Sequence, residues 1–199
     1  MQHPSEPHVV ALCGSLRDQS KTRIALREVL TAANDAGAST ELVDLRDYEL
    51  PALNAVDSDV PDSQRLQETV SNADSIVLGT PNYHGSYSGV LKNALDYCGR
   101  DEFSETVVGL LEVAAGQFPG TALVHLRTVC RTLNAWTLPT EVAIPNSHTM
   151  VTEAGIRDQE LSERTARLGR ELARYAGMPR YPELVEQRNE RTVAGAQND

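Results

Sequence analysis

The chain has 199 residues, a size that suits one globular domain with a substantial core. It carries 18 Lys and Arg against 28 Asp and Glu, a formal net charge of -10 at pH 7, which argues against nucleic acid as a partner because such binding depends on clustered cations. No stretch approaches the roughly 18 apolar residues of a membrane span, and the N-terminus lacks signal-peptide features, so we expect a cytoplasmic protein that binds no membrane.

Apolar runs rich in Val and Leu alternate with longer helix-like stretches, a pattern typical of parallel strands covered by helices on both faces. The expected strands are residues 8–13, 40–45, 74–81, 105–113 and 140–145. The expected helices are residues 22–37, 63–73, 88–99, 120–136 and 158–177. Ser63 is the expected N-cap of the second helix, and glycines are expected to end the first and third. The polar stretch 46–62 is expected to be a long loop.

These elements form five βα units and predict an α/β fold, a doubly wound five-stranded parallel sheet in a three-layer αβα arrangement. One domain is expected over residues 1–177, followed by a flexible C-terminal tail over residues 178–199. The three cysteines are odd in number and widely spaced. We therefore expect buried reduced thiols rather than a disulfide framework, and no metal site.

In an open parallel sheet, ligands bind beyond the carboxyl ends of the strands, where the strand order reverses. That rule selects three segments that follow expected strands, residues 14–22, 81–87 and 114–120. The first strand is followed by neither a GxxxxGK[ST] phosphate loop nor a GxGxxG dinucleotide motif, which excludes those two kinds of nucleotide site.

The first segment combines short polar side chains and cations at the start of a helix. Its candidate residues are Ser15, Arg17, Ser20, Lys21 and Thr22. Together with backbone amides at a helix N-terminus, where about half a positive charge is exposed, they would hold a dianionic phosphate. The alternative is an ordinary helix N-cap that uses Ser20 or Thr22, with solvated cations around it.

The second segment surrounds an extended strand end with polar and aromatic groups. Pro81 restrains the residue before it to extended geometry, and Gly85 allows close backbone approach or a positive φ, so a flat ligand would fit against this backbone. The other candidate residues here are Asn82, Tyr83, His84 and Ser86. Taken alone, His84 favours a surface or packing role.

The third segment is rich in small residues. Ala115 and Gly116 leave room for the edge of a ring, and Gln117 offers a hydrogen-bonding side chain. The alternative is a plain tight connection between a strand and a helix.

Together the three segments resemble the NADPH-dependent FMN reductase family, whose members have a flavodoxin-like fold. The resemblance covers roughly residues 8 to 175. A GSxRxxSxN-like loop is present as GSLRDQSKT at 14–22, with Thr22 where family members often carry asparagine. A TPxYxxSxxGxLKNxxD-like segment is present as TPNYHGSYSGVLKNALD at 80–96. The third segment, AAGQFPG, departs from the serine- and glycine-rich turn of the family.

The resemblance implies an FMN-dependent NAD(P)H oxidoreductase. Ser15, Arg17, Ser20 and Thr22 would bind the FMN phosphate, and residues 81–86 would line the isoalloxazine. For Gln117 two interpretations are open, a hydrogen bond to the ring edge or a side chain that faces solvent. Hydride would pass from NADPH or NADH through flavin N5 to a small-molecule acceptor such as a quinone, an azo compound or free flavin. No protein residue is assigned as a catalytic acid, base or nucleophile.

Two other classes remain open from the sequence. A flavodoxin-type electron carrier would bind FMN without NAD(P)H turnover, and an interaction module on the same fold would bind no flavin. The cations Arg17 and Lys21 in the first loop, and the single tryptophan placed after the fourth helix, favour an open flavin ring and hydride exchange over the carrier.

The resemblance also implies a homodimer or homotetramer with FMN near the subunit boundary. The third helix would supply an interface through Tyr87, Val90, Leu91 and Leu95. Burial of Leu91 and Leu95 in the core of their own subunit is the competing interpretation.

Overall fold

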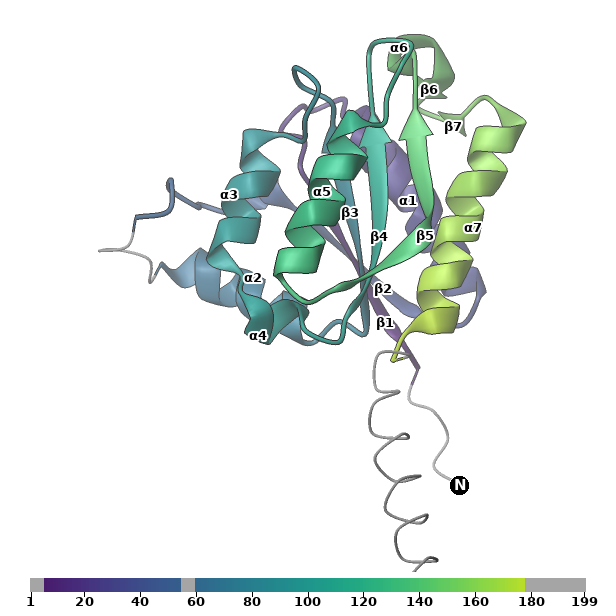
Figure 1. The fold of residues 1–199 in the computed structure, drawn as a ribbon. Helices are drawn as coiled ribbons and strands as arrows, with labels where there is room; N and C mark the ends of the chain where they lie inside the picture. Colours follow the sequence, from purple (N-terminus) through teal and green to yellow (C-terminus); the bar gives the residue numbers. More distant parts are fainter. Residues whose placement is uncertain (1–5, 55–59, 178–199) are drawn as a thin grey trace, which may run out of the picture.

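The computed structural model describes residues 6–54 and 60–177, so the expected tail over 178–199 lies outside the described residues. Five parallel strands form the central sheet in the order β2-β1-β3-β4-β5 (Figure 1). They are β1 (His8–Cys13), β2 (Ser39–Asp44), β3 (Ser75–Pro81), β4 (Val107–Val113) and β5 (Trp136–Ile144). This order is that of flavodoxin, so the doubly wound, flavodoxin-like fold is confirmed.

Helices cover both faces of the sheet. The long helices are α1 (Lys21–Asp35), α2 (Pro61–Ser71), α3 (Gly89–Tyr97), α5 (Thr121–Thr132) and α7 (Gln159–Tyr175). Helices α1 and α7 pack together on one face, whereas α2, α3 and α5 lie on the other (Figure 1). Short elements complete the fold: η1 (Leu45–Asp47), α4 (Arg100–Phe103), α6 (Ser147–Met150) and the hairpin of β6 (Val151–Thr152) and β7 (Gly155–Ile156).

The three inner strands, β1, β3 and β4, are largely apolar because both of their faces are buried. Along β1, Val9 and Ala11 belong to the cluster beneath α1 and α7, and Val10 and Leu12 to the cluster beneath α2, α3 and α5. This alternation follows from the two-residue repeat of a strand. The three loops selected as the candidate site lie at the carboxyl ends of β1, β3 and β4.

Helix α2 starts earlier than the sequence predicted, and the N-cap assignment of Ser63 is wrong. Val60 is the N-cap and Pro61 the first helical residue. Ser63 lies in the first turn, where its hydroxyl donates to the Val60 carbonyl at 2.7 Å. Proline suits the first helical position because its φ is already helical and the missing N–H has no helical partner there.

The predicted helix over 120–136 is too long, and the fifth strand is longer than predicted. Helix α5 ends at Thr132 and the chain reverses at Asn134, whose φ is 62°. Strand β5 then begins at Trp136 and includes Pro139. A proline is tolerated there because β5 is an edge strand, where a missing N–H need not remove a hydrogen bond of the sheet. An irregularity in the pairing, between Val108 and Leu110 of β4, accommodates the extra residues.

All three cysteines are buried and free, as expected. Burial raises the pKa of the Cys98 and Cys130 thiols to about 12, which keeps them protonated at neutral pH. Within residues 6–54 and 60–177, no group of His, Cys, Asp and Glu side chains has the arrangement of a metal site. In the same ranges, no helix combines the length and apolar character needed to cross a bilayer.

Candidate functional site

A cleft of about 360 Å³ lies at the carboxyl end of the sheet, where the three selected segments meet. Eight of the candidate residues line it: Ser15, Arg17, Lys21, Thr22, Pro81, Asn82, Tyr83 and Ala115. Four further residues complete the lining: Gln19, Val113, Ser147 and His148. The remaining candidates, Ser20, His84, Gly85, Ser86, Gly116 and Gln117, lie in the same loops but do not line the cleft.

Helix α1 begins at the floor of this cleft. Ser20 is its N-cap and accepts a hydrogen bond from the Arg23 amide at 3.1 Å. Ser20 is buried with its hydroxyl engaged in the cap, so for this residue the structure shows the N-cap interpretation. Lys21 and Thr22 form the first turn, and they place a charge and a hydroxyl beside the helix's free amides.

Two cations line the cleft without a carboxylate partner. Within the described ranges, neither Arg17 nor Lys21 forms an ion pair, although the protein is strongly acidic. The Arg17 guanidinium instead lies 5.9 Å from the centre of the Tyr83 ring, and both residues line the cleft. The site therefore combines a helix N-terminus with two positively charged side chains that are available to bind an anion.

Arg23 holds the first loop from below and was missed by the sequence analysis. Its guanidinium donates to the Asp44 carboxylate at 3.0 Å and to the backbone carbonyls of Arg17, at 3.1 Å, and Asp18. Burial alone would raise the pKa of Asp44. The hydrogen bonds from Arg46 and the charge of Arg23 outweigh burial, so the pKa lies below its ordinary value. An arginine inside a helix carries no sequence signal of this role.

The first and second loops are joined at Gly14. The Ser88 hydroxyl, at the N-cap of α3, donates to the Gly14 carbonyl at 2.6 Å, and the Gly14 amide donates to the Gly79 carbonyl at 2.8 Å. A Cβ on Gly14 would stand 2.8 Å from Leu91 Cβ and 2.9 Å from Ser88 Oγ. Glycine is required here because the backbone and α3 approach too closely for a side chain.

The second loop contains a two-residue hairpin. Tyr83 and Ser86 exchange backbone hydrogen bonds, at 2.9 and 3.1 Å, and His84 and Gly85 between them have φ values of 53° and 80°. Two successive positive φ values are those of a type I′ turn. The Ser86 hydroxyl lies 2.9 Å from His125 Nδ1 on α5, which ties this hairpin to the neighbouring helix.

The third loop lies between β4 and α5 and is largely exposed over Ala115, Gly116 and Gln117. Its backbone is held by the segment that follows β5, because Asn146 donates to the Gly116 carbonyl and Ser147 to the Ala114 carbonyl, both at 2.9 Å. No atom outside its chain neighbours lies within 4 Å of a Cβ placed on Gly116. The loop therefore leaves open space next to the cleft.

Ser147 and His148 were not among the sequence candidates, although a signal for them existed. They follow the carboxyl end of β5, and the rule that selected the other three loops applies equally to this strand. The prediction ended β5 at residue 145 and passed over the segment behind it. Its helix α6 brings His148 to the wall of the cleft.

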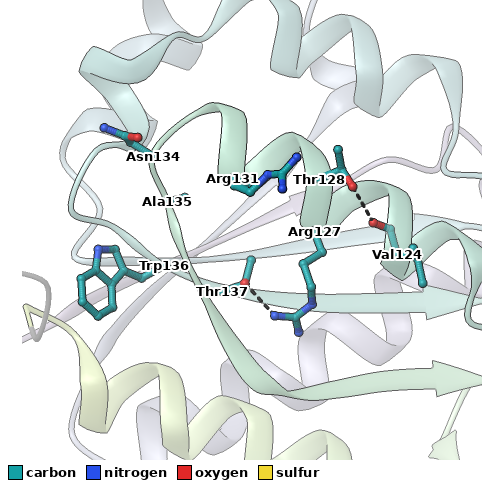
Figure 2. Close-up of a pocket in the computed structure, with 8 residues that line it drawn as sticks. All are labelled: Val124, Arg127, Thr128, Arg131, Asn134, Ala135, Trp136 and Thr137. Carbon is teal, nitrogen blue, oxygen red and sulfur yellow. Dashed lines mark hydrogen bonds between the residues drawn. The ribbon is translucent and has the colours of Figure 1, made fainter.

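A larger and more open hollow, of about 630 Å³, lies elsewhere (Figure 2). It is formed by α5, the turn at Asn134 and the start of β5. None of the candidate residues lines it, and Arg127 within it is already bound to Thr137 and Glu141. It includes none of the loops at the carboxyl end of the sheet, so we place the candidate site in the smaller cleft.

Comparison with known proteins gives consistent results. The family model for NADPH-dependent FMN reductase matches residues 7–149. A curated relative, an FMN-dependent NADPH-azoreductase of Staphylococcus aureus (strain USA300), is 31% identical over 182 residues, which cover 87% of this chain and 97% of the relative.

Solved structures support the fold. A flavoenzyme NAD(P)H:acceptor oxidoreductase from Paracoccus denitrificans is 20% identical, with a TM-score of 0.73 over 85% of this chain and 97% of its own. An oxidoreductase from Corynebacterium diphtheriae is also 20% identical, with a TM-score of 0.70 over 86% of this chain and 97% of its own.

Proposed function

This chain belongs to the NADPH-dependent FMN reductase family, and from that premise we propose how its cleft holds the flavin and which acceptors it reduces. The protein is an FMN-dependent oxidoreductase that takes its electrons from a nicotinamide nucleotide. When bound, FMN supplies the hydride chemistry, accepting at N5 and passing the electrons on. The protein's own residues bind and orient the partners of that exchange.

We assign the phosphate of FMN to the first loop. This assignment rests on Arg17 and Lys21, two cations at the N-terminus of α1 that form no ion pair within the described ranges. Ser15, Gln19 and Thr22 line the same part of the cleft and offer hydroxyl and amide groups to phosphate oxygens. Thr22 supplies its hydroxyl from the first turn of α1, beside the free amides of the helix N-terminus.

We assign the isoalloxazine to the second and third loops. Pro81, Asn82 and Tyr83 line the cleft beside Val113 and Ala115, because the ends of β3 and β4 are neighbours in the sheet. Small and flat groups there leave room for a planar ring, and the open loop at Gly116 gives access from solvent. A nicotinamide or an acceptor would stack from that open side, and no protein side chain needs to transfer a proton.

We propose that the acceptor is a small molecule such as a quinone, an azo compound or free flavin. The curated relative from Staphylococcus aureus is named an azoreductase, which supports azo compounds within this range. The exposed cleft, lined by both polar and apolar groups, suits flat aromatic acceptors more than a macromolecule.

The test is a steady-state assay with purified protein and FMN. We expect NADPH or NADH to be oxidised, with faster turnover when a quinone or an azo dye is added. An electron carrier would bind FMN yet oxidise neither nucleotide, and a flavin-free module would leave the fluorescence of added FMN unchanged. Either of those results would contradict the proposed function.

We also propose that the protein is a cytoplasmic homodimer or homotetramer. Leu91 and Leu95 of α3 are buried in the subunit's own core, so any interface there would use Tyr87 and Val90, which are half-buried. Light scattering after gel filtration would measure the mass directly, and a monomer at micromolar concentration would contradict this proposal.

A further inference from the structure

Glu112 is a fully buried carboxylate at the carboxyl end of β4. It pairs in register with Thr80 of β3, between the second and third loops. Within the described ranges, no lysine, arginine or histidine forms an ion pair with it. A buried carboxylate of this kind requires hydrogen-bond donors to replace water.

Three N–H groups, from the second loop and from the N-terminus of α5, surround this carboxylate. Its Oε2 accepts from the Gly120 amide at 3.0 Å and from the Leu123 amide at 3.3 Å, at the N-terminus of α5. Its Oε1 accepts from Asn82 Nδ2 at 2.5 Å. Helix N-termini favour a negative charge, so α5 stabilises the carboxylate while Glu112 supplies the acceptor that the glycine N-cap lacks.

The bonds to Glu112 and from the Gly85 amide agree on which way the Asn82 amide points. Because a carboxylate only accepts hydrogen bonds, Asn82 must turn its Nδ2 toward Glu112 and its Oδ1 away. That Oδ1 accepts from the Gly85 amide at 3.0 Å, inside the type I′ hairpin. The orientation of one amide therefore links the buried acid to the hairpin beside the cleft.

We infer that Glu112 is a positioning residue for FMN: it fixes the Asn82 amide and, through it, the hairpin of residues 83–86, and so the part of the cleft wall that Asn82 and Tyr83 form. This inference rests on the proposed function, because it assumes that FMN occupies the cleft that Asn82 lines. Glu112 itself is buried and is not among the residues that line the cleft. Its influence passes through one hydrogen bond to a residue in the wall of the cleft.

A role confined to stability makes a different prediction. If Glu112 only caps α5, its loss lowers stability through Gly120 and Leu123, and the identity of residue 82 does not matter. If Glu112 acts through Asn82, reversing donor and acceptor between the two side chains should restore the wall. In the reversed pair, an amide at 112 donates to a carboxylate at 82, whose second oxygen still accepts from Gly85.

The experiment compares Glu112→Gln, Asn82→Asp and the exchange variant that carries both substitutions, in the full chain. The Kd for FMN is measured by fluorescence titration, and the midpoint of thermal unfolding by circular dichroism. In Glu112→Gln two amide N–H groups would face each other, and in Asn82→Asp two carboxylates would face each other. Because either change removes the hydrogen bond between the two side chains, we expect each to raise the Kd for FMN roughly 10-fold. The exchange variant should return to within about 3-fold of the unmutated protein.

Glu141→Gln serves as the matched control, because it makes the same change on the neighbouring strand in a carboxylate that pairs with Arg127 outside the cleft. Its Kd for FMN should stay unchanged. The inference is overturned if the Kd of the exchange variant is raised by the product of the two single-variant factors. It is also overturned if Glu112→Gln leaves the Kd for FMN unchanged. If Glu112→Gln does not fold, the Kd for FMN of the exchange variant is compared with that of Asn82→Asp. A lower Kd in the exchange variant supports the inference, and an equal or higher Kd overturns it. Failure of the unmutated protein to bind FMN refutes the proposed function instead.

Discussion

The guanidinium of Arg23 and the carboxylate of Asp44 form a buried ion pair, 3.0 Å apart, directly beneath the first loop. Asp44 ends β2, and Arg23 belongs to the first turn of α1. The two residues lie 21 positions apart in the chain. The second Arg23 nitrogen, Nη2, donates to loop carbonyls, so one side chain fastens the first loop to the sheet.

Replacing Arg23 should loosen this loop. We expect Arg23→Met to raise the Kd for FMN by at least about 10-fold, since the Arg17 and Asp18 carbonyls lose their donor. The free energy of unfolding should fall by about 2 kcal/mol, less than for an isolated buried pair because Arg46 still neutralises Asp44. Fluorescence titration and urea unfolding measure the two effects. The exposed Arg27→Met, on the same helix, is the control, and an equal effect there would contradict the assignment.

The stability of the protein should depend on the ionisation of Asp44. Its folded pKa lies below the ordinary value of 3.8, so the unfolded chain binds this proton more readily. The stabilisation is complete above that ordinary value and is lost as the pH falls through the folded pKa.

We expect Asp44→Asn to be less stable than the unmutated protein at pH 7, and the difference to shrink below about pH 4. Urea unfolding across that range gives both curves. A difference that stays constant with pH would show that the charge of Asp44 contributes nothing to stability.

Arg17 and Ser20 should separate ligand binding from helix stability. Arg17 is exposed at the cleft, so Arg17→Ala should raise the Kd for FMN roughly 10-fold and leave the unfolding midpoint in place. Ser20 caps α1, so Ser20→Ala should lower the free energy of unfolding by about 1 kcal/mol. Titration and thermal melts of both variants test the distinction, and a stability loss in Arg17→Ala would argue against it.

Gly85 should tolerate only residues that accept its backbone conformation. Its φ of 80° lies in the left-handed region, where a β-branched residue would lower the free energy of unfolding by at least about 1 to 2 kcal/mol. Gly85→Val should therefore distort the hairpin and reduce the fraction of purified protein that carries FMN. Gly85→Asn, which suits the same φ, should retain more flavin. The ratio of flavin to protein absorbance measures occupancy, and equal occupancy in both variants would contradict the argument.

Several features of the fold follow from local pattern alone. The strand and helix order was predictable because a strand repeats every two residues and a helix every 3.6, and buried parallel strands are apolar throughout. The position of the cleft was predictable because ligand sites of open parallel sheets lie at the carboxyl ends of the strands, and residues of all three selected loops line it. The roles of these residues toward FMN stay predictions. Helix ends were less accurate, as at Ser63, because more than one residue near a boundary can begin a helix.

By itself, the sequence of this protein determined the layers, the family signatures and the loops that build the cleft. Only the tertiary structure decided which side chains serve one another: Asp44 beneath Arg23, Glu112 behind Asn82, and His148 at the wall. The reason is physical, since periodicity and turn chemistry act over a few residues, whereas these contacts join segments brought together by the strand order β2-β1-β3-β4-β5.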